Sequence, residues 1–220
     1  IDLRKYCGLH ETSVVAIPNA PSGLLAPVAA MEEVLRTNPD NIVVVDETYV
    51  EFAPAGSSCL PLLEKYENLV ITHTFSKTHN LAGARLGYCI ARPGLITDMN
   101  RVQFSYSPYN VNSMTQAAGT AAIRDEAYFH EVTAKLLATR TAATEGLRQR
   151  GFTVFDSAAN FLFATPDRMP CKEIFEKLRA QGILIRHFNA PRISNYLRIT
   201  IGTDAEMQRF FAALEEILGA

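Results

Sequence analysis

The residue with the clearest chemical potential is Lys77, which follows an apolar, β-branched run that begins at Leu69. Such a run predicts a buried strand that delivers a lysine at its carboxyl end. An unprotonated lysine amine attacks carbonyl carbons and holds them as a Schiff base. A lysine considered alone is most often an exposed surface residue, so its interpretation depends on what neighbouring strands bring to the same place.

Two other predicted strands also end in polar residues. The apolar run at residues 13–17 is closely followed by Asn19, and the run at residues 42–45 is followed by Asp46 and Tyr49. Ligands of open parallel sheets bind beyond the carboxyl ends of the strands. A single carboxylate there is usually a turn or helix cap. A lysine, an aspartate and a tyrosine together match pyridoxal phosphate, whose aldehyde needs the lysine, whose ring nitrogen needs a carboxylate and whose phenolate oxygen needs a donor.

A phosphate-binding function is predicted for Ser76 and Arg85, because a cofactor phosphate needs hydroxyls, backbone N–H groups and an arginine. The alternative for Arg85 is a surface salt bridge. Its position among Gly83, Ala84 and Gly87 favours the phosphate, since small neighbours allow a ligand to approach the backbone closely.

The elements that must position these residues are predicted from the spacing of apolar residues and from turn signals. In the first part of the chain the strands are expected at residues 13–17, 42–46, 69–77 and 87–91, and the helices at 27–37, 60–66, 95–106, 113–124 and 126–150. The all-apolar strands require cover on both faces, which predicts an α/β domain with a mostly parallel sheet. Pro27 is expected at the first helical position of its helix.

The last part of the chain has an α+β pattern. Strands are expected at residues 152–155, 160–164, 183–186 and 196–201, and helices at 172–181 and after the capping box of Thr203 and Glu206. We therefore expect part of a large cofactor-binding domain at residues 1–125, and a long connecting helix with a small domain at residues 126–220.

Composition places the chain among ordinary globular proteins: it has 220 residues, 48% of them hydrophobic and 20% charged, with a formal net charge of −2. That balance argues against nucleic acid as a partner, and no apolar stretch is long enough to span a bilayer. Cys7, Cys59, Cys89 and Cys171 lack zinc-site spacing, so we expect no metal, reduced thiols and a cytoplasmic protein. The chain has no initiator methionine and no signal-peptide core, and we expect it to be a piece of a longer protein.

Four segments resemble the motifs of fold-type I, pyridoxal-phosphate-dependent aminotransferases. Residues 76–87 are similar to the segment that carries the cofactor lysine, residues 18–23 to the asparagine-proline-threonine-glycine turn, and residues 45–52 to the segment with the ring-nitrogen aspartate and the phenolate tyrosine. The form Asp-Glu-x-Tyr-x-Glu-Phe and residues 196–203 are most like the histidinol-phosphate aminotransferases of that family. The resemblance runs in order across almost the whole chain.

The resemblance implies roles for five residues in binding pyridoxal 5′-phosphate. Lys77 would be the Schiff-base lysine and then the proton shuttle. Asp46 would pair with the pyridinium nitrogen, and Tyr49 would hydrogen-bond the phenolate oxygen. Ser76 and Arg85 would hold the phosphate.

For the substrate, the resemblance implies that Arg198 clamps the α-carboxylate of the amino donor, and it makes Arg186 the candidate for the substrate phosphate. Asn160 would line the site, and Tyr109 lies where the family's chain approaches the neighbouring subunit of a homodimer. For Arg186 and Asn160, surface pairing or strand capping is an equal alternative.

The sequence departs from the family pattern in two places. The asparagine of the family's turn is replaced by Ala20, and Asn19 stands one position earlier, so Asn19 is the candidate for that contact. The family's upstream phosphate-cradling loop, ring-stacking aromatic and partner-directed tyrosine have no counterpart in this chain.

The expected activity is amino transfer between L-histidinol phosphate and 2-oxoglutarate in histidine biosynthesis. The alternatives are another enzyme on the same fold, such as a threonine-phosphate decarboxylase or an aromatic aminotransferase, and a non-enzymatic binding module or inactive fragment. We expect no membrane and no nucleic-acid partner.

Overall fold

The computed structural model describes residues 2–219, and these form two compact units. The first unit comprises the chain up to Asn19 together with Leu25–Glu131, and the second comprises Ala20–Leu24 together with the chain from Val132 onward. The division falls within helix α5 (Glu126–Gln149), whereas the boundary predicted from sequence lies at the start of that helix.

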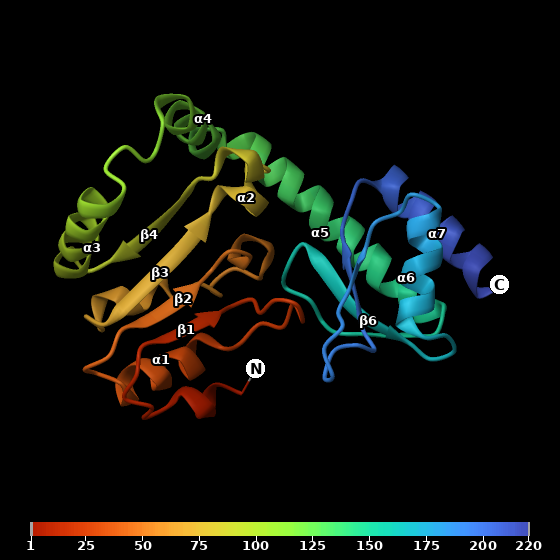
Figure 1. Ribbon diagram of the computed structural model, residues 1–220, viewed down its shortest axis with the longest axis horizontal. Coiled ribbons are helices and arrows are strands. Elements are labelled where there is room, and N and C mark those ends of the chain that lie inside the picture. The colour runs from red at the N-terminus through yellow and green to blue at the C-terminus, as the bar shows by residue number, and fades with distance from the viewer. Residues whose placement is uncertain (1, 220) are drawn as a thin grey trace. The chain divides into compact units, whose positions relative to one another are not determined.

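The first unit contains a four-stranded sheet in the order β1-β2-β3-β4. Its strands are β1 (Ser13–Ala16), β2 (Val43–Asp46), β3 (Leu69–Thr74) and β4 (Gly87–Ala91). The first three are parallel and β4 runs antiparallel to β3. Figure 1 shows the four strands side by side. The predicted mostly parallel α/β sheet is therefore confirmed.

Alternation along the strands separates the two faces of this sheet. Val43, Val45 and Ile71 are fully buried in one apolar cluster with Met31 and Leu35 of helix α1 (Val28–Thr37). Successive strand residues point to opposite faces. The residues between these, including the last residue of β2, therefore belong to the face opposite α1.

The remaining elements of the first unit are mostly short. They are η1 (Leu3–Tyr6), η2 (Val50–Phe52), η3 (Leu60–Glu64), α2 (Phe75–Thr78), η4 (Ala82–Ala84), α3 (Pro93–Tyr106), α4 (Ser113–Arg124) and the first turn of α5.

Two predictions in this unit were wrong in detail. The helix predicted at residues 60–66 is the 3-10 helix η3, because its backbone bonds, such as Lys65 N–H to the Leu62 carbonyl, span three residues. Pro27 is the N-cap of α1 and not its first helical residue.

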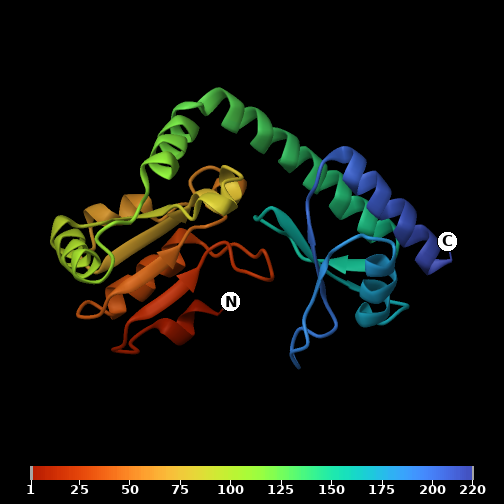
Figure 2. The same ribbon diagram turned by 45° about the horizontal axis from the view of Figure 1, so that its top comes forward.

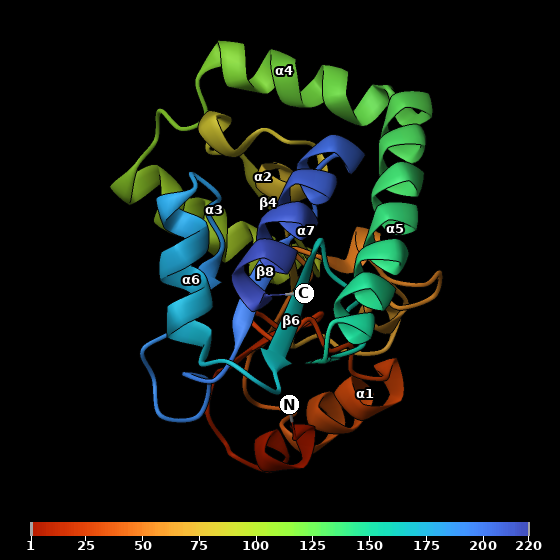
Figure 3. The same ribbon diagram turned by 90° about the vertical axis from the view of Figure 1, so that its right-hand side faces the viewer.

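The second unit contains an antiparallel sheet in the order β5-β6-β8-β7. Its strands are β5 (Phe152–Val154), β6 (Phe161–Pro166), β7 (Arg186–His187) and β8 (Leu197–Thr200), and its helices are α5, α6 (Cys171–Ala180) and α7 (Asp204–Leu218). In Figure 3 the three helices stand side by side over the sheet. The predicted capping box begins α7, with the Thr203 hydroxyl accepting from the Glu206 N–H and the Glu206 carboxylate accepting from the Thr203 N–H.

The helices cover one face of the second sheet. Leu162, Leu197 and Ile199 are buried in the cluster that α5, α6 and α7 share. Because side chains alternate, Phe163 and Arg198, which are opposite each other in the β6–β8 register, lie on the face away from the helices, where Phe163 is buried against Tyr196 and Phe188.

The strand predicted at residues 183–186 is wrong for its first three residues. The Ile183 N–H donates to the Leu178 carbonyl at 2.9 Å and the Gly182 N–H donates to the Arg179 carbonyl at 3.0 Å. Gly182 has a φ of 74°, so the end of α6 forms a Schellman cap. Ile183 and Ile185 then pack against the core while Leu184 is exposed, and pairing with β8 starts only at Arg186.

Candidate active site

The carboxyl ends of β1, β2 and β3 meet at one edge of the first sheet. Asp46, the last residue of β2, is in register with Ala16 of β1 and Thr72 of β3. The Ile17 N–H continues the pairing with a 2.9 Å bond to the Asp46 carbonyl, and the half-buried Asn19 follows. The three arrows coloured red to gold in Figure 2 point the same way. The sheet thus brings Asn19, Asp46 and the approach to Lys77 to one edge.

Lys77 lies beyond β3 and not on it. The strand ends at Thr74, whose hydroxyl accepts a 3.1 Å hydrogen bond from the Ser76 N–H and so caps the single turn of α2. Lys77 is in this turn, and its side chain is exposed. The prediction that the strand itself carries the lysine is wrong, because the capping threonine ends the strand first.

Asp46 presents one free carboxylate oxygen. The N–H and hydroxyl of Thr48 both donate to its Oδ1, at 3.0 and 2.5 Å. Among residues 2–219 no hydrogen bond reaches Oδ2. By strand alternation Asp46 shares its sheet face with Thr72, opposite α1. The half-buried Tyr49 comes three positions after Asp46 and is the N-cap of η2. The carboxylate is oriented by its own turn and keeps an acceptor for a ligand.

Arg85 is close to the start of α2. Its neighbour Leu86 accepts a 3.1 Å hydrogen bond from the Phe75 N–H, the first residue of that helix. Arg85 has a φ of 54°, and its Nη1 donates to the Ala82 carbonyl at 3.1 Å. The space beside Gly83 is open, since no atom lies within 4 Å of where its Cβ would be. Ser76 therefore lies in the lysine turn and Arg85 lies close to its start, and their role in binding a phosphate stays a prediction.

His79 stands between two aromatic rings just after the lysine turn. Its centroid lies 4.9 Å from that of Phe75 and 5.1 Å from that of Phe129. Burial lowers the pKa of His79, and the negative charge of Glu51 opposes that effect. The neutral imidazole is the form that this packing favours.

Two arginines stand directly opposite each other on the face of the second sheet that points away from its helices. Arg186 of β7 and Arg198 of β8 are Cα partners. The Arg198 guanidinium carbon lies 5.1 Å from the Phe161 ring centroid and 6.0 Å from that of Phe188, and the Arg186 carbon lies 5.5 Å from Phe188. Within residues 2–219 neither guanidinium has a carboxylate partner. Like charges in this arrangement repel, so the pair favours binding of an anion.

The two remaining predicted site residues are less constrained. Asn160 is half-buried immediately before β6, and its carbonyl accepts a 2.9 Å bond from the Ile201 N–H, which places it at the end of β8. Tyr109 is 94% exposed in the connection between α3 and α4. Its role stays a prediction.

Sequence reasoning missed three residues that contact the predicted site residues or their neighbours. Glu47 follows Asp46 and is 1% exposed, and its carboxylate oxygen lies 3.3 Å from Nε2 of His73. An acid directly after a strand-end acid was the available signal for Glu47. Phe188 contacts both arginines, and its position two residues after Arg186 places it on the same side of an extended segment. All five histidines were interpreted as structural or solvated, and His73 lies beside this carboxylate.

Neither a metal site nor a membrane span is found in the part of the chain that the structure describes. No group of three or more potential metal ligands occurs within residues 2–219. No helix there is long and apolar enough to cross a bilayer.

Sequence comparison gives a consistent family. The model of the aminotransferase class I and II family matches residues 8–214. A histidinol-phosphate aminotransferase 2 of Dechloromonas aromatica is 42% identical over 215 residues, which are 97% of this chain and 60% of that protein. The histidinol-phosphate aminotransferase of Brachyspira hyodysenteriae is 39% identical over 218 residues, 99% of this chain and 61% of that protein. The chain thus spans about three fifths of the length of these curated relatives.

Structural comparison agrees with the family match. The crystal structure of histidinol-phosphate aminotransferase from Sinorhizobium meliloti in complex with pyridoxal-5′-phosphate superposes with a TM-score of 0.86 at 28% identity, covering 94% of this chain and 57% of that one. The expected fold-type I architecture is therefore confirmed. The chain belongs to the aminotransferase class I and II family.

Proposed function

We propose that the protein containing this chain is a pyridoxal-phosphate-dependent aminotransferase that exchanges an amino group between L-histidinol phosphate and 2-oxoglutarate. The observation that carries the proposal is the sheet edge at which Asp46 ends β2 beside the β3 segment that leads into Lys77. The names of the relatives supply the substrate, and with it a place in histidine biosynthesis.

The residues at this edge fit pyridoxal 5′-phosphate by their chemistry. The cofactor needs an amine, a carboxylate acceptor, a phenol donor and a cation, and Lys77, Asp46, Tyr49 and Arg85 supply one of each from neighbouring segments. The free Oδ2 of Asp46 is the acceptor that a protonated ring nitrogen requires. When bound, the cofactor supplies an electron sink for the carbanion at the substrate Cα.

The chain's own residues would position the reactants and move the proton. The Lys77 amine would hold the cofactor and then carry the proton removed from the substrate Cα. Asp46 would keep the ring nitrogen protonated, and Tyr49, with Asn19, would donate to the phenolate oxygen. Ser76 and Arg85 would bind the phosphate.

The paired arginines would bind the anionic groups of the substrates. Histidinol phosphate has no α-carboxylate, so in this reaction the carboxylate expected at Arg198 is that of 2-oxoglutarate, held in a bidentate contact. Arg186 would hold the phosphate of histidinol phosphate. Their shared contact with Phe188 keeps two cations on one face, and none of residues 2–219 offers either of them a carboxylate partner. Asn160 would line the same site.

A homodimer forms part of the proposal. Apolar side chains are exposed along the end of α3, the following loop and the start of α4. They are Val102, Phe104, Tyr106, Tyr109, Val111 and Met114. Tyr106 and Met114 are 90% and 83% exposed, which is unusual for large apolar residues within one continuous segment. A second copy of the chain is the partner that would cover them.

The test is covalent mapping followed by an assay of the reaction. The chain is mixed with pyridoxal phosphate, reduced with borohydride, digested and analysed by mass spectrometry. The reduced adduct is expected on Lys77 and lost in Lys77→Ala, while Lys65→Ala, which removes an exposed lysine paired with Glu32, keeps it. An adduct spread evenly over surface lysines would overturn the cofactor assignment.

The reaction is then followed in the full-length protein with histidinol phosphate and 2-oxoglutarate. Glutamate formation without carbon dioxide release is expected. Release of carbon dioxide from a phosphorylated amino acid, or no turnover by a protein that binds the cofactor, would contradict the proposed reaction.

A further inference from the structure

A buried carboxylate lies on the opposite face of the sheet from Asp46. Glu47 is 1% exposed, and it accepts hydrogen bonds from the Cys59 N–H at 2.6 Å and from the Ser58 hydroxyl at 2.7 Å. Its third contact is with Nε2 of His73 at 3.3 Å. A buried carboxylate is costly unless such donors satisfy it.

We propose that Glu47, through His73, is a positioning residue of the candidate active site: the pair locks the end of β3 to the end of β2 and so sets where Lys77 stands relative to Asp46. This inference rests on the proposed function for its consequence on cofactor binding. Its structural part, a lock between two strand ends, rests on the contacts alone.

The register explains why this contact matters more than others along the strands. Asp46 pairs with Thr72, and the Glu47 N–H donates to the Thr72 carbonyl at 2.9 Å. Beyond that bond β2 turns away into η2, while β3 continues to the lysine turn. The side-chain contact between Glu47 and His73 is the next interaction between the two segments. It follows the pairing of Asp46 with Thr72 and comes before Lys77 along the chain.

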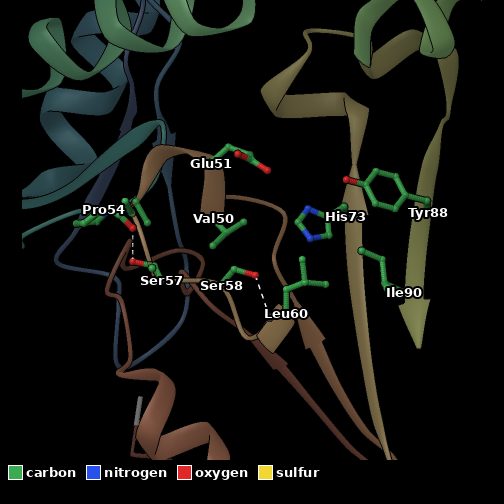
Figure 4. A pocket seen from close by; sticks show the side chains of 12 residues that line it. Val50, Glu51, Pro54, Ser57, Ser58, Leu60, His73, Tyr88 and Ile90 are labelled. Atoms are coloured by element: carbon green, nitrogen blue, oxygen red, sulfur yellow. Dashed lines mark hydrogen bonds between the residues drawn. The ribbon is translucent and has the colours of Figure 1, made fainter. Parts of the chain in front are cut away.

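The second side of the His73 ring is fixed by β4. His73 and Tyr88 are opposite each other in the β3–β4 register, and their rings stack with centroids 5.1 Å apart and planes at 3°. The His73 side chain is 12% exposed. Figure 4 shows both rings at the wall of a pocket of about 330 Å³, which Glu51 and Leu60 also line. With a carboxylate at Nε2 and an aromatic ring against its face, the imidazole has one orientation.

A purely structural role for Glu47 would act through the loop and not through β3. Ser58 and Cys59 tie the carboxylate to the loop before η3, and neither leads to the lysine turn. Glu47 also adds to the effect of burial in raising the pKa of the Cys59 thiol to about 12, which places its negative charge against this loop. The positioning role and the structural role of Glu47 can therefore be separated by removing either the His73 imidazole or the Ser58 hydroxyl.

The experiment compares His73→Phe with Ser58→Ala. His73→Phe keeps an aromatic ring for Tyr88 but removes the imidazole nitrogen that lies 3.3 Å from the Glu47 carboxylate, whereas Ser58→Ala removes a hydrogen-bond donor from the loop side of the same carboxylate. Amide hydrogen exchange in the cofactor-free chain is the first readout, followed by the dissociation constant for pyridoxal phosphate. We expect faster exchange at Phe75 and Ser76 and about tenfold weaker cofactor binding in His73→Phe only, because Lys77 is then no longer held in place relative to Asp46. A tenfold change in the dissociation constant corresponds to about 1.4 kcal/mol.

His73→Gln is the conservative variant, since its side-chain amide can contact the Glu47 carboxylate as the imidazole does, and it is expected to restore most of the protection and affinity. Equal effects of His73→Phe and Ser58→Ala, or unchanged exchange at the lysine turn, would overturn the inference. If the unmodified chain binds no cofactor, the proposed function fails, and the exchange comparison still decides whether Glu47 and His73 lock the strand ends.

Discussion

Gly87 allows the close approach of β4 to the strand that leads to Lys77. It begins β4 and is the register partner of Thr74, the last residue of β3. A Cβ at this position would lie 2.8 Å from the backbone carbonyl oxygen of His73. Ordinary contact begins at 3.4 Å, so in Gly87→Ala the backbone of β3 or β4 must move by roughly half an ångström.

The expected cost of Gly87→Ala follows from the kind of atom that is displaced. A backbone oxygen within a paired strand cannot rotate away as a side-chain end can, so the overpacking penalty of about 1–3 kcal/mol applies. For a chain of this size each kcal/mol lowers the midpoint of thermal unfolding by about 2–4 °C. Because the displaced carbonyl is on the segment that leads to the lysine turn, pyridoxal phosphate is expected to bind more weakly as well.

The assay is thermal and urea unfolding monitored by circular dichroism, with a cofactor titration at a temperature where both proteins are folded. Gly94→Ala is the matched control, since its Cβ position has no neighbour within 4 Å and it lies in the first turn of α3, just after β4 and away from the candidate site. The control is expected to change stability by less than about 0.5 kcal/mol. If Gly87→Ala is as stable as its control and binds the cofactor equally well, the packing argument is wrong.

Three further outcomes are expected. Phe188→Leu removes the ring beneath both guanidiniums, so the KM for a phosphorylated substrate should rise severalfold with little change in kcat, and an unchanged KM would refute the contact's role. Burial lowers the pKa of His79, so its contribution to stability is complete above pH 6.5 and is lost as the pH falls through the lowered value; urea midpoints measured downward from about pH 7 should fall less in His79→Gln than in the unmodified chain. Burial raises the pKa of the Cys59 thiol to about 12, so iodoacetamide at about pH 8 should modify the half-buried Cys89 well before Cys59, as peptide mapping would show.

Most of the first unit could be predicted from sequence because its signals are local. The run of β-branched residues at β2 needs cover on both faces, and the helix predicted at residues 113–124 matches α4 in both bounds. The capping box at Thr203 likewise depends only on residues within one turn. Local patterns of this kind specify an element without reference to the rest of the fold.

The wrong predictions fall where the same residue type is compatible with two different local structures. Thr74 is β-branched and extends the strand pattern, yet its hydroxyl caps the turn that carries Lys77. Ile183 and Ile185 suit a strand, but a helix end followed by apolar residues on the core uses the same composition. Only tertiary contacts choose between such alternatives.

The part of the candidate site at the carboxyl ends of the parallel strands could be predicted from sequence. The parts that depend on strand register or on contacts with later segments could not. Asp46 and the lysine segment meet because the carboxyl ends of adjacent parallel strands share an edge. The direct opposition of Arg186 and Arg198 depends on the register of β7 against β8, which no local pattern specifies. The burial of Glu47 could not be predicted for the same reason, since its contacts come from a later loop and another strand.

The mixed direction of the first sheet has a consequence for how the chain acquires its structure. The antiparallel partners β3 and β4 are joined by a short connection, whereas each parallel pair joins segments separated by a helix or a long loop. Closing long loops costs more entropy and slows folding. The β3–β4 ribbon, with its lysine turn, is therefore expected to form early, and Asp46 to arrive beside it only when β2 docks. The chain would then become able to bind a ligand only in the last steps of folding.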